Sequence, residues 1–339
     1  MTPIALAERG LVPDPLSRLG IRRLLAKTLR DEMAWQADGL NALIDELRAS
    51  PIAINTADAN SQHYELPTEY FRTVLGPRLK YSACYWPTGV NTLDGAELAS
   101  LELVAERADI RDGMRVLELG CGWGAFSLWL AERYPGCQVQ AVSNSATQRA
   151  HINAQCLARG ITNLAAHTAD MNDFEPDAGP FDRIVSIEMF EHMRNHGALM
   201  ARIRRWLAAN GRLFVHIFSH RHLAYPYRAE SGDDWMAEYF FAGGIMPSQS
   251  LLLYFQDDLR IERHWQLNGR HYQRTLEAWL AEHDRSAATV KALFRDVYGA
   301  EAPRWFHRWR LFYMASAELF GFRGGQEWQV SHYRFEPRA

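Results

Sequence analysis

Cysteine is scarce in this chain, and its few copies follow no metal-binding pattern. The 339 residues include four cysteines, at positions 84, 121, 137 and 156, and no two of them have C-x-x-C spacing. Neither a zinc site nor a disulfide framework is therefore indicated. We expect no bound metal ion and a reducing compartment, which favours the cytoplasm.

Long apolar runs and a large net charge are also lacking. No window approaches about 20 uninterrupted apolar residues, and the N-terminus carries no apolar leader. We therefore expect neither a membrane span nor export. The formal net charge is -3, which gives no electrostatic reason to expect a nucleic-acid partner.

The chain does have a regular alternation of strand and helix patterns, and 47% of its residues are hydrophobic. From residue 115 onward this alternation predicts an α/β fold with a doubly wound sheet. Thr92 is a good N-cap for a preceding helix that runs to about Ala108. Strands are predicted at 115–119, 138–143, 164–168, 181–187, 212–217, 258–264 and 327–335, and helices near 125–134, 146–158, 195–207, 272–298 and 302–320.

Composition shifts divide the chain into four parts. We expect an N-terminal helical and lid region at 1–92, a Rossmann-like core at 93–219, a substrate-cap insertion at 220–250 and core-completing elements at 251–339. Residues 13–50 predict helices, the second of them over Glu32–Arg48, whereas 55–92 looks irregular. Leucines and basic residues interleave over 16–30, a pattern that suits packing on the protein itself or contact with an anionic membrane.

A glycine-rich turn follows the strand predicted at 115–119. Gly120, Gly122 and Gly124 remove every Cβ where the backbone turns into the next helix. The spacing is not the G-x-G-x-x-G of a dinucleotide site, and no G-K-[ST] follows. Glu118 stands at the carboxyl end of the strand, where open α/β sheets bind ligands. A carboxylate there suits a cationic ligand, such as an amino-acid ammonium group, better than a pyrophosphate.

Polar side chains follow the next two strands. Asn144 and Gln148 are placed to hydrogen-bond ribose hydroxyls, although Ser143–Thr147 could equally cap the next helix. Asp170 follows the third strand and suits either an adenine amino group or the cap of a turn. These positions carry two interpretations each on sequence grounds.

A carboxylate pair and an imidazole follow the fourth strand. Glu188, Glu191 and His192 lie within five residues, interleaved with apolar side chains. Such a half-buried cluster at the ligand edge of the sheet favours proton transfer. His216 ends the fifth strand and either points at the same site or is a satisfied core histidine. Tyr272 belongs to a polar turn that returns to this edge.

These motifs together resemble the cyclopropane-fatty-acid-synthase-related branch of S-adenosylmethionine (SAM)-dependent methyltransferases, over roughly residues 60–335. Four segments carry the resemblance, and further segments from Ser186 to Met193 and from Tyr239 to Asp258 make the chain most similar to coclaurine N-methyltransferase-like enzymes. The four are His63-Tyr64-Glu65-Leu66-Pro67, Tyr81-Ser82-Ala83-Cys84-Tyr85, Leu119-Gly120-Cys121-Gly122-Trp123-Gly124 and Phe190-Glu191-His192.

The resemblance implies a class I SAM-methyltransferase fold, a Rossmann-like doubly wound sheet with an N-terminal helical extension and a cap insertion. It implies SAM as cofactor and a small aryl-alkyl or benzylisoquinoline-type amine as substrate. It also implies catalytic or amine-binding roles for Glu188, Glu191 and His192. The SAM contacts implied are Tyr81, Ser82, Gly120, Asn144, Gln148 and Ile187, to which the residue patterns add Glu118, Gly122 and Asp170.

One departure bears on the alternative function, that of a cyclopropane-fatty-acyl-phospholipid synthase or another lipid C-methyl or methylene transferase. Those enzymes carry bicarbonate, held partly by a cysteine directly after Tyr-Ser, where this chain has Ala83. Their other bicarbonate contacts correspond to Glu191, His216 and Tyr272, which we expect to contact substrate here. Membrane contact is expected only under this alternative. A non-enzymatic SAM-binding protein is a third reading, which the acid cluster disfavours, and the first helices are candidates for a homodimer contact.

Overall fold

A seven-stranded sheet forms the centre of the computed structural model, which describes residues 2–54, 66–227 and 235–338. The strand order is β3-β2-β1-β4-β5-β9-β8. Strands β1 to β5 are mutually parallel, whereas β9 runs antiparallel to both β5 and β8. The bounds are β1 (Arg115–Leu119), β2 (Gln138–Ser143), β3 (Leu164–Thr168), β4 (Phe181–Ile187), β5 (Leu207–His220), β8 (Leu259–Leu267) and β9 (Trp328–Pro337).

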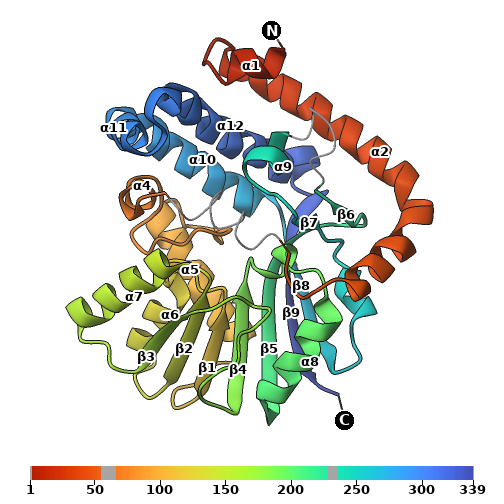
Figure 1. The fold of residues 1–339 in the computed structure, drawn as a ribbon, viewed down its shortest axis with the longest axis vertical. Coiled ribbons are helices and arrows are strands. Elements are labelled where there is room, and N and C mark those ends of the chain that lie inside the picture. Colours follow the sequence, from red (N-terminus) through yellow and green to blue (C-terminus); the bar gives the residue numbers. More distant parts are fainter. Residues whose placement is uncertain (1, 55–65, 228–234, 339) are drawn as a thin grey trace.

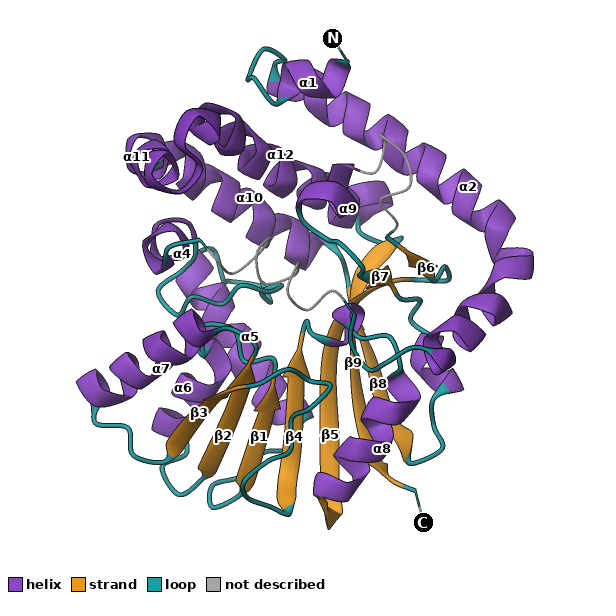
Figure 2. Cartoon of the chain, viewed as in Figure 1, coloured by secondary structure: helices purple, strands orange, loops and turns teal. Residues whose placement is uncertain are grey.

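Helices cover both faces of this sheet. Figure 2 shows α8 on one face, with α5 and α6 on the other. Thr92 caps α5 as predicted, since its Oγ1 accepts a hydrogen bond from the Gly95 N–H at 3.1 Å. The doubly wound α/β prediction is confirmed. The helices flanking the sheet are α5 (Leu93–Arg107), α6 (Ala125–Arg133), α7 (Ala146–Arg159) and α8 (His196–Trp206).

The strand order reverses between β1 and β4, and this reversal positions the site. The chain passes outward from β1 through β2 to β3, then returns to the other side of β1 as β4. Leu119 at the end of β1 pairs with Ser186 of β4 and Val142 of β2. Crossovers that leave in opposite directions open a crevice at the carboxyl ends of the strands. The glycine turn and the acid cluster both lie there.

A layer of helices lies beyond the carboxyl ends of the parallel strands (Figure 1). Its core is aromatic, with Tyr70, Trp309 and Tyr313 fully buried. The predicted helix over 272–298 is two helices, because the chain breaks at Ser286. The segment 55–92, expected to be irregular, contains a short helix. The layer comprises α4 (Thr68–Val74), α10 (Arg270–Arg285), α11 (Ala287–Tyr298) and α12 (Ala302–Gly321), with α9 (Trp235–Tyr239), β6 (Tyr225–Pro226) and β7 (Ile245–Met246) nearby.

The N-terminal helices differ from expectation in one respect. After α1 (Pro3–Ala7), a single helix α2 spans Asp14–Ala49, where two had been predicted. No proline or capping motif interrupts the sequence near residue 31, so the helical hydrogen bonds continue through it. Figure 1 shows α2 running along the outside of the molecule.

One segment that carries the family resemblance is only partly described. Its residues His63, Tyr64 and Glu65 lie outside the described residues. Within the described ranges, no helix is both long enough and apolar enough to cross a bilayer. The four-part division of the chain stays a prediction.

Candidate functional site

A pocket lies over the carboxyl ends of β1, β2 and β4, and we call it the strand-end pocket. Its lining includes most of the predicted cofactor contacts. These predicted contacts are Tyr81, Ser82, Glu118, Gly120, Gly122, Asn144, Gln148 and Ile187. The pocket is also lined by Lys80, Glu188 and His192.

Two glycines of the turn, Gly120 and Gly124, pack closely against neighbouring side chains, whereas Gly122 faces open space. All three glycines have positive φ, at +77°, +53° and +79° for Gly120, Gly122 and Gly124. A Cβ on Gly120 would lie 2.8 Å from Cβ of Met189, and one on Gly124 would lie 2.6 Å from Cγ1 of Ile152. A Cβ on Gly122 would meet no atom within 4 Å. Gly122 therefore leaves room where a ligand can approach the backbone.

Glu118 lies on the floor of this pocket and is 3% exposed. Its carboxylate accepts a hydrogen bond from Oγ of Ser127 on α6. Burial raises the pKa of Glu118 to about 7, and the Ser127 hydrogen bond only partly offsets this. A cation bound nearby would lower that pKa and stabilise the ionised carboxylate. The site chemistry thus fits a positively charged ligand.

The polar residues after β2 cap the next helix, and two of them also line the strand-end pocket. Ser145 caps α7, since its Oγ accepts from the Gln148 N–H at 3.3 Å. The Gln148 side-chain oxygen accepts from Oγ of Ser143 at 2.5 Å. Nε2 of Gln148 is buried and has no hydrogen-bond partner among the described residues. Asn144 and Gln148 both line the pocket, so this buried donor fits a ligand acceptor such as a ribose or adenine atom.

Asp170 caps a turn. Its Oδ1 accepts from the Asn172 N–H at 2.8 Å. Its neighbours Ala169 and Met171 line the pocket, whereas Asp170 is not among the lining residues. The structure thus supports the turn-cap interpretation, and contact with adenine stays a prediction.

Lys80 is a buried cation beside the pocket that the sequence analysis missed. It is 2% exposed, and its Nζ donates to Oγ of Ser82 at 2.7 Å and to the Ala83 carbonyl at 2.6 Å. These bonds fix the loop that carries Tyr81 and Ser82. The only signal in the sequence is a lysine standing directly before the Tyr-Ser motif, which is too common a pattern to interpret alone.

A second pocket, the aromatic pocket, meets the first. Tyr81, Glu188 and His192 line both, so they stand where the two spaces join. Tyr227 and Phe241 come from the predicted cap region. The remaining lining includes Glu191, Phe218, Met236, Met246, Tyr272, Trp279, Phe312 and Phe320.

Glu188 is the centre of a converging set of hydrogen-bond donors. Its Oε1 accepts from the Ala83 N–H at 2.8 Å and is 3.1 Å from Nε2 of His216, and its Oε2 accepts from the Tyr272 hydroxyl at 2.7 Å. The pKa of Glu188 is raised on balance, because burial raises it and the Lys80 charge and the hydrogen bonds from Ala83 and Tyr272 only partly offset this. Its φ of +47° is a left-handed conformation that non-glycine residues rarely adopt. Strain of this kind concentrates at functional sites.

Glu191 lies in a different environment although it is three residues away. It is 1% exposed, and its Oε2 has no hydrogen-bond partner among the described residues. Burial and the negative charge of Glu188 raise the pKa of Glu191 well above its usual value. Of the two carboxyl groups, Glu191 therefore holds its proton more strongly. A cation bound nearby would lower this pKa and leave an ionised carboxylate that could act as a general base.

The two predicted substrate contacts are both tied to Glu188. Tyr272 lines the aromatic pocket and stacks on Phe320 with ring centroids 4.3 Å apart. His216 is 3% exposed and lies behind Glu188, outside the lining of both pockets. The satisfied-core interpretation of His216 thus fits the structure better than direct substrate contact. His192 lies in both pocket walls, 4.7 Å from the ring of Phe241.

The arrangement joins a cation-compatible pocket to an aromatic pocket through two carboxylates and an imidazole. Aromatic faces and carboxylates attract cations. Among the described residues that line the two pockets, His192 and the buried Lys80 are the only basic side chains. Among the described residues, no group of His, Cys, Asp and Glu could hold a metal ion. The junction can therefore bind an amine, accept its proton and stabilise a new ammonium ion.

Comparison with known proteins gives consistent matches. A family profile described as mycolic acid cyclopropane synthetase matches residues 53–330. The chain is 39% identical to (S)-coclaurine N-methyltransferase of Thalictrum flavum subsp. glaucum, over 98% of this chain and 94% of that protein. It is 31% identical to the cyclopropane-fatty-acyl-phospholipid synthase of Escherichia coli (strain K12), over 79% of this chain and 66% of that protein.

A solved structure is similar over almost the whole chain. The crystal structure of coclaurine N-methyltransferase bound to N-methylheliamine and SAH superposes with a TM-score of 0.93. The two sequences are 39% identical, and the match covers 98% of each chain.

Proposed function

We infer the function from one premise: the chain belongs to the mycolic acid cyclopropane synthetase family and is a methyltransferase whose methyl donor is SAM. We propose that its acceptor is the nitrogen of a small aryl-alkyl or benzylisoquinoline-type amine. The observation that carries this proposal is the junction itself. Glu188 and His192 stand between the strand-end pocket and the aromatic pocket, and the buried carboxyl of Glu191 faces the latter.

In the proposed reaction, SAM supplies the methyl group that the amine lone pair attacks. An amine that arrives as an ammonium ion must first lose a proton. The ionised form of Glu191, or His192, would accept it. The positive charge of bound SAM would lower the raised pKa of the Glu191 carboxyl and so favour that ionised form. Glu188, held by its three donors, would present a fixed negative charge to the new ammonium. The aromatic lining would add cation–π attraction of roughly 0.5–2 kcal/mol.

The strand-end pocket is the proposed SAM site. Gly122 leaves space for it, Glu118 supplies a buried carboxylate for a cationic group, and Gln148 supplies a buried donor. The other proposed contacts are Tyr81, Ser82, Gly120, Asn144, Asp170 and Ile187.

The lipid alternative has one observation in its favour and one against it. On α2 the side chains of Leu16 and Leu24 are exposed in a stretch that also carries basic residues, which would suit an anionic membrane. Against it, His216 and Tyr272, which the family resemblance assigns to bicarbonate, are already hydrogen-bonded to Glu188. A protein carboxylate takes up the donors that a bound anion would need. We therefore favour the amine.

The test is an acceptor panel. Purified protein is incubated with methyl-labelled SAM and, separately, with tetrahydroisoquinolines, phenethylamines and vesicles of unsaturated phospholipid, and products are followed by mass spectrometry. Label on an amine supports the proposal and identifies the substrate class. Label only in the lipid, as an added methylene, contradicts it, and firm flotation with anionic vesicles would point the same way.

Two further proposals concern the setting of the reaction. All four cysteines are free and three are buried, which supports a reducing compartment such as the cytoplasm. The exposed leucines of α2 support a homodimer in which a second copy covers them. Light scattering of the purified protein would test the dimer.

A further inference from the structure

A chain of buried hydrogen bonds runs from Glu188 away from both pockets. Nε2 of His216 is 3.1 Å from Oε1 of Glu188, and Nδ1 of His216 is 2.9 Å from Nε2 of His332. Nδ1 of His332 is in turn 2.9 Å from Nη1 of Arg107. The two histidines face each other because they are paired residues on the antiparallel strands β5 and β9.

Arg107, at the end of this series of hydrogen bonds, determines which atom donates in each of them. A guanidinium can only donate, so Nδ1 of His332 must accept and carry no proton. The neutral ring of His332 then carries its proton on Nε2 and donates it to Nδ1 of His216. That leaves the His216 proton on Nε2, where it is donated to the Glu188 carboxylate. Each ring nitrogen in this series is therefore either a donor or an acceptor, and every donor faces an acceptor.

Both histidines are held in the neutral form that this scheme requires. They are 3% and 1% exposed. Burial lowers the pKa of His216 well below its usual value, helped by the positive charges of Lys80 and Arg107. Burial also lowers the pKa of His332, with further contributions from His216, Arg107, Lys80 and His264. A second proton on either ring would place N–H against N–H.

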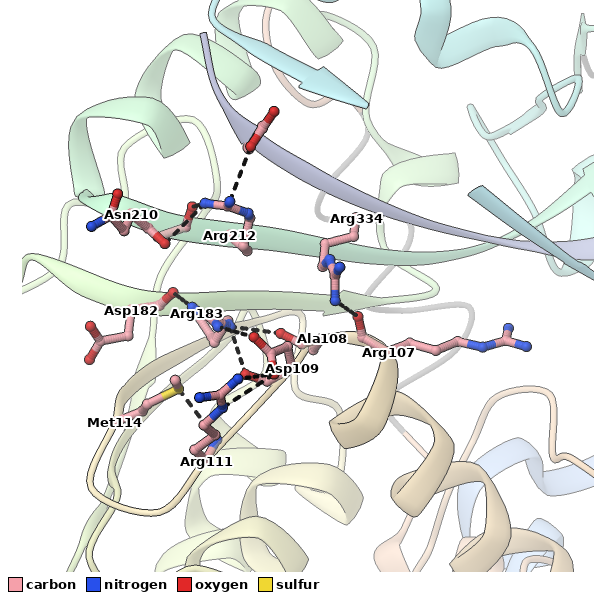
Figure 3. Close-up of polar contacts among 12 residues, drawn as sticks. Arg107, Ala108, Asp109, Arg111, Met114, Asp182, Arg183, Asn210, Arg212 and Arg334 are labelled. Carbon is pink, nitrogen blue, oxygen red and sulfur yellow. Dashed lines mark hydrogen bonds and ion pairs between the residues drawn. The ribbon is translucent and has the colours of Figure 1, made fainter. Parts of the chain in front are cut away.

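Arg107 is placed to serve this purpose. It is the last residue of α5, and its guanidinium lies 5.1 Å from the centre of the Trp265 ring. Its carbonyl oxygen accepts from Arg334 at 3.1 Å. Figure 3 shows the Arg107 side chain extending away from the neighbouring cluster around Arg111 and Arg183. The Arg107 guanidinium therefore points away from the cluster around Arg111 and Arg183.

We propose that Arg107 and His332 are positioning residues for the methyl transfer, because together they hold His216 in the tautomer that donates Nε2–H to Glu188. In the other tautomer, the His216 Nε2 lone pair would face the carboxylate oxygen and repel it. The hydrogen bond from His216 thereby favours the ionised form of Glu188 and orients its carboxylate. The catalytic consequence rests on the role proposed above for Glu188, whereas the tautomer assignment does not.

The first experiment needs no substrate. Nitrogen-15 NMR of the histidine-labelled protein distinguishes protonated from bare ring nitrogens, and His216→Gln and His332→Gln samples assign the two rings. We expect a proton on Nε2 and a bare Nδ1 in both. A proton on Nδ1 of either ring, or an imidazolium near neutral pH, overturns the proposal whatever the acceptor panel shows.

The second experiment tests the positioning role. Arg107→Met should lower kcat about tenfold, leave the KM for SAM unchanged and move the acid limb of the kcat profile to higher pH, since a lost donor raises a carboxyl pKa. Arg107→Lys, which also only donates, should restore most of kcat and the tautomer. Arg111→Met removes the same charge from an exposed arginine and should change none of these. If Arg107→Met keeps the wild-type kcat and pH profile, Arg107 has no positioning role.

Discussion

Replacing Glu191 by glutamine should lower activity and raise stability, and both changes should be larger than those caused by Glu188→Gln. In Glu191→Gln the proposed proton acceptor is lost, so activity should fall by roughly 10²–10⁴. Glu188→Gln keeps an oxygen that can accept from Ala83 and His216, so its activity should fall much less. Near-wild-type activity of Glu191→Gln on an amine would remove the role assigned to Glu191.

Stability should move the other way. Burial and the Glu188 charge raise the pKa of Glu191, so above its ordinary value of 4.5 this carboxyl tends to stay protonated when folded and ionise when unfolded. Stability is then lost as pH rises, by about 1.4 kcal/mol for each unit of pKa elevation. A glutamine has no such cost. Glu191→Gln should therefore be more stable than wild type near about pH 7.5, and the gain should vanish near about pH 4.

Glu188→Gln should gain less stability than Glu191→Gln. Burial raises the pKa of Glu188 on balance, so its replacement also removes a cost near neutral pH. However, its donors Ala83, His216 and Tyr272 then face a neutral amide. Hydrogen bonds to a charged group contribute about 1.5–3 kcal/mol each, which offsets that gain. Urea unfolding of both variants at the two pH values, beside a methyl-transfer assay, measures all four quantities. A Glu188→Gln variant stabilised as much as Glu191→Gln, or a Glu191→Gln variant destabilised near neutral pH, would refute the distinction drawn between the two carboxyl environments.

The other predictions concern the glycine turn and Glu8, a buried carboxylate directly after α1 whose Oε1 accepts hydrogen bonds from Arg308 Nε and Trp235 Nε1, each at 2.9 Å. Gly122→Ala should raise the KM for SAM and cost about 1–2 kcal/mol of stability, because its φ is left-handed. Gly124→Ala should unfold more readily, because the added Cβ would meet Ile152. SAM titration measures the binding effect, and thermal unfolding measures the loss of stability. Burial raises the pKa of Glu8, but hydrogen bonds from Arg308 and Trp235 outweigh it and lower the pKa on balance. Glu8→Gln should therefore melt below wild type near neutral pH, with a difference that shrinks as pH falls below 4.5; a gap independent of pH would contradict this.

Much of the sheet could be predicted because its signals are local. Strands β1 to β4 begin and end at the predicted residues, since buried parallel strands read as short apolar runs bounded by turns. The glycine turn and the acid cluster follow such strands directly, so the sheet topology brings them to one edge. The expected break in the N-terminal helix was wrong, because amphipathic spacing alone does not mark a helix end.

The polar network behind Glu188 could not be predicted, because it depends on contacts distant in sequence. His332 lies 116 residues from His216, and Arg107 lies 225 residues from His332. Their meeting depends on the β5–β9 register, which no local pattern specifies. For the same reason His216 was assigned to the substrate although its ring is turned to Glu188 and His332. The positive φ of Glu188 likewise could not be predicted, because glycine is the residue that usually indicates this conformation.

The central claim is that the donor and the amine meet at the Glu188–Glu191–His192 junction. The most direct test is a crystal structure of the protein with SAH and an N-methylated tetrahydroisoquinoline. We predict SAH over Gly122 and Gln148, the ring of the amine in the aromatic pocket, and its nitrogen within about 3 Å of Glu191 or His192. An amine bound outside the aromatic pocket, or a nitrogen turned away from all three residues, would contradict the account.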